Sequence, residues 1–383
     1  MGRIANMLVR NIGTTCWMAW STTCPSLRFR AASSVIRDAQ NTCRQKLDML
    51  PEECLPHGML VQRKYMKEKH WIYAILMAAM ETLPLTYKEC TRVDILNAVL
   101  AKAYLGASSK LLDNLNDEIH TVQEALDSLE NYLCALTCGE YQRKGSSPVL
   151  MAESSACEMA SWIYQSLNHD APAFKLYLKD CTTLVEGQIS SLEHKSTEWP
   201  SLADYVDYIA EKSIGDVWID IDLCQFDDLN EDLLLLKKSN EYIFKSSLVY
   251  DDVQDIYEDI QTRSVNSALI RALEREIISE EDLDTKEPAE LVRLLERGGV
   301  LEDIIWLADA FFLKGISAFM EMETSSVDKE GLLSSFRLVR LFNLRKLLMR
   351  NKDTKTLKRV LQSFSDFHSL REQIPEGIGA LVG

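Results

Sequence analysis

Glycine and proline are both scarce in this chain of 383 residues, with 15 and 9 residues respectively. Strand-rich folds of this length need many turn residues, so the scarcity favours long helices. No segment alternates apolar and polar side chains for long enough to predict a strand, and no apolar run approaches the roughly 20 residues of a membrane-spanning helix. Acidic residues outnumber basic ones by 58 to 42, and the net charge of −16 disfavours nucleic acids and anionic membranes as partners.

Motifs of several common enzyme classes are also missing. The sequence contains no glycine-rich phosphate loop, no nucleophile elbow and no dinucleotide fingerprint, and its six histidines show no metal-binding spacing. The ten cysteines are scattered, so we expect reduced thiols rather than a disulfide framework. Cys134 and Cys138 have no matching second pair for zinc, and we interpret them as a structural thiol pair.

Helical periodicity dominates what is present. Apolar residues make up 46% of the chain and charged residues 26%, which is enough to bury a sizeable core. We therefore predict an all-α fold, a single large helical bundle over residues 59–372. The helical patterns lie at about 60–82, 91–105, 107–137, 150–167, 172–196, 201–222, 230–262, 300–322, 329–350 and 354–371.

The two ends of the chain differ from this bundle in composition. Residues 1–37 contain five arginines, eight serines or threonines and no acidic residue, which is typical of an organellar transit peptide. The same residues also fit an N-terminal helix with basic ends, or a start codon placed too early. We expect a cytoplasmic protein in which 1–58 form a basic, loosely attached segment and linker, and 373–383 form a flexible tail.

The most informative segment is an acidic stretch at 251–259. At about 100° per residue, Asp251, Asp252, Asp255 and Asp259 share one stripe of a helix. The same face is apolar one and two turns upstream, which is unusual for a solvated face. Carboxylates stacked on a partly buried face repel one another, and such a cluster persists when cations neutralise it. The stretch therefore indicates a Mg²⁺ site, with a solvated acidic face as the alternative.

A second acidic stripe lies about 140 residues earlier in the sequence. Asp113 and Asp117 are four residues apart and share one helix face, whereas Leu111 and Leu115 mark the opposite, core-facing stripe. This pattern alone is weak, because acidic helix faces are common. Two such stripes facing each other would hold Mg²⁺ ions between them and clamp a diphosphate that bridges the metals.

Two aspartate-rich helices in an all-α chain of this length resemble the class I isoprenoid synthases. This superfamily comprises trans-prenyl diphosphate synthases, squalene/phytoene synthases and class I terpene synthases. Glu186-Gly187-Gln188 is similar to the Gly-Gln of trans-polyprenyl synthases, and residues 202–213 resemble their Tyr…Ile…Lys-Thr segment. The resemblance implies a bundle with a central apolar cavity, in which Lys212, with Gln188 and Arg263, contacts the substrate diphosphate.

The sequence departs from the trans-prenyl synthases near the first motif. Asn114 replaces the second aspartate, so the motif reads D-x-x-x-D and is closer to that of squalene/phytoene synthases. No Gly-Lys-Arg stretch precedes the motif and no Arg-Arg pair follows it, although such residues hold isopentenyl diphosphate in chain-elongating enzymes. Other basic residues could substitute for them or form a solvated helix face: Arg63, Lys64, Lys67 and Lys69.

We predict a Mg²⁺-dependent enzyme of isoprenoid biosynthesis that ionises an allylic prenyl diphosphate and transfers the prenyl group. The alternatives are a class I terpene synthase that cyclises a long prenyl diphosphate, and a non-catalytic helical scaffold. Arg337 or Arg340 would help to hold the diphosphate, and the resemblance implies a homodimer as one assembly. The predicted catalytic carboxylates and Mg²⁺ ligands are Asp113, Asp117, Asp251, Asp252 and Asp255, with Asp259 as a further ligand.

Overall fold

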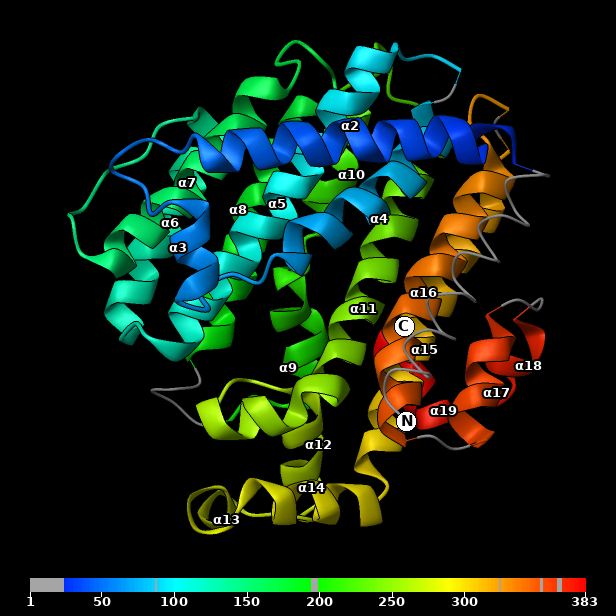
Figure 1. The fold of residues 1–383 in the computed structure, drawn as a ribbon. Helices are drawn as coiled ribbons and strands as arrows, with labels where there is room; N and C mark the ends of the chain where they lie inside the picture. Colours follow the sequence, from blue (N-terminus) through cyan, green and yellow to red (C-terminus); the bar gives the residue numbers. More distant parts are fainter. Residues whose placement is uncertain (1–23, 87, 194–198, 324, 352–353, 364–366) are drawn as a thin grey trace.

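The computed structural model describes residues 24–383 except 87, 194–198, 324, 352–353 and 364–366. The described residues form helices joined by turns, without a strand among them, which confirms the prediction of one large all-α bundle (Figure 1). The first part consists of η1 (Pro25–Leu27), α2 (Phe29–Asp48), α3 (His57–Gln62), α4 (Lys69–Thr86), α5 (Arg92–Glu118), α6 (Val122–Cys138), α7 (Pro148–Ser166) and α8 (Phe174–Glu193).

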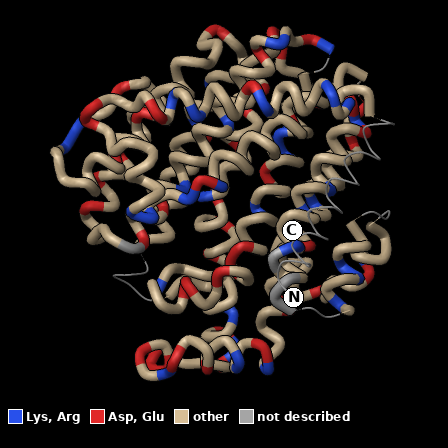
Figure 2. Tube along the Cα trace, viewed as in Figure 1, with Lys and Arg blue, Asp and Glu red and all other residues tan. Residues whose placement is uncertain are grey.

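The second part is built around one long helix, α11, which runs beside α15 and α16 (Figure 1). Acidic and basic residues are interspersed along the bundle, and α13 at one end is acidic (Figure 2). The elements are α9 (Leu202–Asp207), η2 (Ile209–Lys212), α10 (Gly215–Leu223), α11 (Glu231–Thr262), α12 (Ser267–Glu274), α13 (Glu280–Thr285), α14 (Pro288–Arg297), α15 (Val300–Glu321), α16 (Lys329–Asn351), α17 (Thr354–Gln362), α18 (His368–Arg371) and α19 (Glu376–Val382).

Helix α11 takes part in both hydrophobic clusters of the core. Its first half contributes Leu236 and Ile243 to the larger cluster, and its second half contributes Val253 and Ile256 to the smaller one. The second half packs against α15. Because burying one such aliphatic side chain stabilises the fold by about 1.5–3 kcal/mol, this packing determines the direction in which the opposite, acidic face of α11 points.

Two helix boundaries differ from the sequence-based expectation. The helix expected at 60–82 is divided into α3 and α4, because the chain turns at Lys64, whose φ of 65° is left-handed. The two helices expected between 91 and 137 do not meet near Gly106. Helix α5 continues through this glycine, and a capping box at Thr121 starts α6 instead.

Both ends of the described chain pack more closely than expected. Helix α2 contacts α4 and α5 and buries an apolar stripe that includes Val35 and Cys43, so residues 29–48 are not loosely attached. Ile378 and Val382 of α19 are likewise buried, and this helix contacts α15. Residues 1–23, which make up most of the arginine-rich segment, lie outside the described residues. The division into domains at residues 58 and 372 stays a prediction.

None of the described helices combines the length and the apolar character that crossing a bilayer requires.

Candidate functional site

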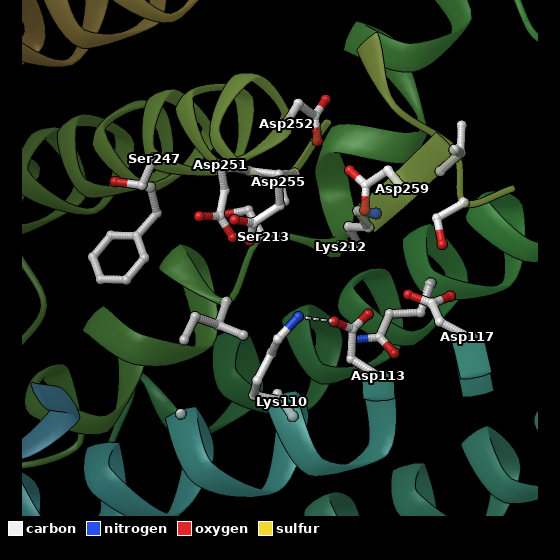
Figure 3. Close-up of a pocket in the computed structure, with 18 of the residues that line it drawn as sticks. Lys110, Asp113, Asp117, Lys212, Ser213, Ser247, Asp251, Asp252, Asp255 and Asp259 are labelled. Carbon is white, nitrogen blue, oxygen red and sulfur yellow. Dashed lines mark hydrogen bonds and ion pairs between the residues drawn. The ribbon is translucent and has the colours of Figure 1, made fainter. Parts of the chain in front are cut away.

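A cavity of about 350 Å³ lies between α5 and α11 (Figure 3). Ile214, Phe244 and Leu248 line its apolar part, and charged side chains line the remainder. We call it the acidic cavity. The structure brings eight of the nine predicted site residues to its wall: Asp113, Asp117, Gln188, Lys212, Asp251, Asp252, Asp255 and Asp259.

The α5 side of the acidic cavity follows from the register of the helix. Leu111 and Leu115 are fully buried on the core-facing side, so Asp113 and Asp117 point into the cavity (Figure 3). The sequence analysis missed Lys110, whose Nζ lies 2.6 Å from Asp113 Oδ2. Neighbouring carboxylates, Asp113 above all, raise the pKa of Lys110, so its ammonium group stays charged. The only signal in the sequence was a basic residue three positions before the first aspartate.

On the α11 side, Asp252 ties the acidic stripe to the start of α12. Its side chain is buried, and Ser267 donates two hydrogen bonds to its Oδ2, from the backbone N at 2.8 Å and from Oγ at 2.5 Å. Burial raises the pKa of Asp252, while Lys212 and the hydrogen bonds from Ser267 oppose that rise. Asp252 therefore anchors α12 as well as lining the cavity.

The crowding of carboxylates has its clearest effect on Asp259. Burial and, next, the charge of Asp252 raise the pKa of Asp259 from 3.8 to about 8. A hydrogen bond of 2.7 Å from Asn266 Nδ2 and the charge of Lys212 only partly counteract this rise. The carboxyl group of Asp259 consequently holds a proton at neutral pH when no metal is bound.

Gly187 explains how Gln188 and Lys212 reach the same cavity. A Cβ atom at Gly187 would lie only 2.3 Å from the backbone N of Lys212 and 2.6 Å from the carbonyl carbon of Glu211. The missing side chain lets η2 lie directly against α8. The helix expected at 201–222 is divided here into α9, η2 and α10, and this division directs Lys212 toward the acidic stripe.

A second cavity of about 320 Å³ adjoins the first, and we call it the basic cavity. Its basic wall consists of Lys64, Lys67, Lys69 and Arg345, together with His70. Burial, followed by the charges of nearby lysines, lowers the pKa of His70 to about 3, so its imidazole is neutral. The two cavities share a wall formed by Gly106, Lys110, Asp117, Asp251, Asp255, Asp259 and Ser264.

Asn114 connects the basic cavity to the first acidic stripe. Its Nδ2 donates a hydrogen bond of 2.9 Å to the carbonyl oxygen of Tyr65, in the turn between α3 and α4. An aspartate at this position could not donate that hydrogen bond when ionised. The departure from the trans-prenyl synthase motif therefore has a structural role, because it holds the turn that carries Lys64 and Lys67 against α5.

Phe244, which lines the acidic cavity, packs against residues of the core. Trp218 packs against Phe244 with ring centroids 5.3 Å apart. Behind Trp218, the fully buried Lys102 forms ion pairs of 2.5 Å with Asp222 and 3.3 Å with Glu81. These charged groups belong to the core and do not line the cavity.

Three predictions about individual residues are not supported by their positions. Arg263 takes a left-handed conformation at the end of α11 and pairs with Asp284, outside the lining of the acidic cavity. Arg340 is buried and bonds to Asp309 at 2.7 Å, so it stabilises the core rather than a diphosphate. Cys134 and Cys138 are exposed, which is not expected of a structural thiol pair.

The carboxylates of the acidic cavity form a donor set that fits Mg²⁺. All of them offer hard oxygen ligands, and they come from two facing helices. Six aspartates line the cavity against Lys110 and Lys212, so the lining carries an excess of acidic groups. A divalent cation would relieve that excess.

Glu211, Asp216 and Glu241 form another acidic group, with ligand atoms within 4.8 Å of one another. Lys245 already forms ion pairs of 2.6 Å with Glu211 and 2.7 Å with Glu241. Lys237 pairs with Asp216 at 3.0 Å, so each carboxylate of this group already has a lysine as its partner.

The chain resembles known proteins in its fold but not in its sequence. No protein-family model matches the chain, and no curated protein matches it by sequence. Solved structures do match over most of their length, and they are prenyl diphosphate synthases and terpene synthases. The chain has the class I isoprenoid synthase fold, as the resemblance of its motifs implied.

The individual likenesses are distant in sequence. A decaprenyl diphosphate synthase from Rhodobacter capsulatus is 12% identical, with a TM-score of 0.57 over 81% of this chain and 97% of that one. A geranylgeranyl pyrophosphate synthetase from Pyrococcus horikoshii is 14% identical, with a TM-score of 0.53 over 82% and 99%. A linalool/nerolidol synthase from Streptomyces clavuligerus is 11% identical, with a TM-score of 0.51 over 80% and 98%. The TM-scores show a shared fold, and at such low identities the likeness shows the fold alone.

Replacing Gly187 with alanine should separate η2 from α8. The new Cβ would clash with backbone atoms, which cannot rotate away as a side chain can, so we expect Gly187→Ala to lower the free energy of unfolding by about 1–3 kcal/mol. Urea denaturation measures this loss. Gly58→Ala is the control, because a Cβ there meets no atom within 4 Å. Equal stabilities of the two variants would contradict the close approach.

Replacing Asp259 with asparagine should stabilise the metal-free protein at neutral pH. Between about pH 4 and 8 the folded wild type keeps the proton that the unfolded chain releases, so its stability falls as pH rises through this window. Asparagine does not titrate, so the advantage of Asp259→Asn should grow from pH 5 to pH 8 and then level off. Melting temperatures in EDTA measure it, with Glu281→Gln in the exposed α13 as the control. A pH-independent difference would refute the assignment.

Proposed function

We propose that this protein is a Mg²⁺-dependent enzyme that ionises an allylic prenyl diphosphate and transfers the prenyl group to a second substrate. The observation that carries the proposal is the pair of aspartate stripes on α5 and α11, which face each other across one cavity with an apolar end. The names of the structural neighbours, which include synthases of decaprenyl and geranylgeranyl diphosphates, agree with this substrate class.

The charged part of the acidic cavity would hold the diphosphate. Asp113 and Asp117 on α5 would bind Mg²⁺ from one side, and the aspartates of α11 from the other. Mg²⁺, when bound, would neutralise the diphosphate and so stabilise it as a leaving group. Lys212 and Gln188 lie on the same wall and would contact the diphosphate oxygens, supplying positive charge and hydrogen bonds where negative charge develops.

The apolar part of the same cavity would receive the prenyl chain. Ile214, Phe244 and Leu248 line this part, and the Trp218 ring packs against Phe244. Once the C–O bond breaks, an allylic cation must be kept away from water that would quench it. Apolar side chains exclude that water, which is their contribution to the reaction.

The basic cavity favours transfer to a second substrate over cyclisation. Its three lysines and Arg345 would bind an anionic co-substrate, and the wall that it shares with the acidic cavity would place the two reactants side by side. The neutral imidazole of His70 could donate one hydrogen bond there. A terpene synthase that cyclises a single diphosphate needs no second anion site.

Product analysis tests the function directly. The full chain is incubated with radiolabelled geranyl, farnesyl or geranylgeranyl diphosphate, with and without isopentenyl diphosphate, in MgCl₂ or in EDTA. We expect a longer diphosphate that forms only with both substrates and Mg²⁺. Hydrocarbon or alcohol products without isopentenyl diphosphate would indicate a terpene synthase, and an absence of any product would favour the scaffold.

Asp255→Asn tests the acidic stripe at one position. The change keeps the size of the side chain but removes one clustered negative charge, so the rate should fall on the order of 10²–10³-fold. The metal-free protein should be no less stable than the wild type, because like-charge repulsion is relieved. The control is Glu281→Gln in the exposed first turn of α13, which should keep nearly normal activity. Full activity of Asp255→Asn would exclude the metal-binding role.

A further inference from the structure

Lys110 occupies an unusual position on the wall between the two cavities. It lies on α5, one turn before Asp113, and lines both the acidic and the basic cavity (Figure 3). Its Nζ is 2.6 Å from Asp113 Oδ2, yet 44% of its side chain remains exposed. The ammonium group is therefore bound to a predicted metal ligand and still has open space in which to move.

The groups that face Lys110 come from several elements. Asp117 on its own helix and Asp251 and Asp255 on α11 add negative charge, while Lys212 on η2 adds positive charge. The basic cavity adds Lys64, Lys67, Lys69, Arg345, neutral His70 and the carboxylate of Glu258. Lys110 thus lies on the wall between the carboxylates of the acidic cavity and the mixed charges of the basic cavity.

An ammonium group and Mg²⁺ compete for the same carboxylate oxygens. Mg²⁺ binding at Asp113 would weaken the contact with the lysine, because the two cations repel each other at this distance. The displaced ammonium sits on a flexible four-carbon stem and binds phosphate oxygens as a compact point charge. Within reach of that stem lies the place where the diphosphate would sit.

We propose that Lys110 is an exchangeable counter-cation of the site, which neutralises Asp113 in the metal-free protein and binds the substrate diphosphate once Mg²⁺ has taken the carboxylate. This inference rests on the proposed function. It assigns Lys110 two successive partners, first the carboxylate of Asp113 and then the substrate diphosphate.

The two roles predict effects of opposite sign on two binding constants. Lys110→Met removes the competitor of Mg²⁺, so MgCl₂ alone should bind about tenfold more tightly than to the wild type. The same variant lacks a cation for the diphosphate, so inorganic diphosphate at saturating MgCl₂ should bind about tenfold more weakly. A lysine that merely supports the fold would not separate the two constants in this way.

The experiment titrates the full chain with MgCl₂ alone and then with inorganic diphosphate at saturating MgCl₂, by thermal shift and calorimetry. Lys110→Arg keeps the charge and should resemble the wild type. The matched control is Lys286→Met, because Lys286 also forms a partly exposed ion pair, 2.9 Å from Asp282, but lies on neither cavity. It should change neither constant.

Each other outcome counts against the inference. If both constants of Lys110→Met move in the same direction, or neither moves, Lys110 is not an exchangeable counter-cation, although the proposed function stands. If the wild type binds neither MgCl₂ nor diphosphate, both the proposed function and the role of Lys110 are wrong. If Lys110→Met does not fold, Lys110→Gln carries the same two titrations and the same criteria.

Discussion

Repulsion among carboxylates that share one cavity is the constraint on which the rest of the structure depends. Six aspartates line the acidic cavity, and their charges oppose one another wherever water is partly excluded. The fold offsets this cost in three ways. Helix α11 packs against α15, and Ser267 and Asn266 donate hydrogen bonds to Asp252 and Asp259. In addition, the carboxyl group of Asp259 retains a proton and is therefore neutral. The hydrogen bonds and the retained proton act at the end of α11 near α12.

Elsewhere in the bundle, buried carboxylates are neutralised by buried cations. Lys102 is fully buried between Asp222 and Glu81, and Arg340 is equally buried beside Asp309. Removing either cation would leave a buried carboxylate without its nearest counter-charge, which makes such pairs costly to disrupt. The acidic cavity differs because its nearest cation is 44% exposed and borders open space. Buried pairs of this kind hold the scaffold, whereas an exposed pair can exchange its partner.

The sequence was most informative where one helix carries a complete pattern. The period of α11 placed its aspartates opposite an apolar stripe, and the boundaries expected at 230 and 262 lie within one residue of the observed helix. It was least informative where a site joins distant segments. Arg345 reaches the basic cavity from α16, more than 200 residues beyond Asn114, and no local spacing connects the two. The basic C-terminal region likewise misled the interpretation of Arg340, because charge alone does not distinguish a buried ion pair from a substrate contact.

The basic cavity shows why a missing motif does not imply a missing site. Chain-elongating relatives are expected to hold their second diphosphate with residues of a Gly-Lys-Arg stretch, which this sequence lacks. In this chain the left-handed conformation of Lys64 lies just after α3, and the hydrogen bond from Asn114 to Tyr65 fixes the following turn against α5. The asparagine that makes the first motif atypical therefore holds the turn whose lysines line the basic cavity. A residue that departs from a motif can thus have a structural role of its own.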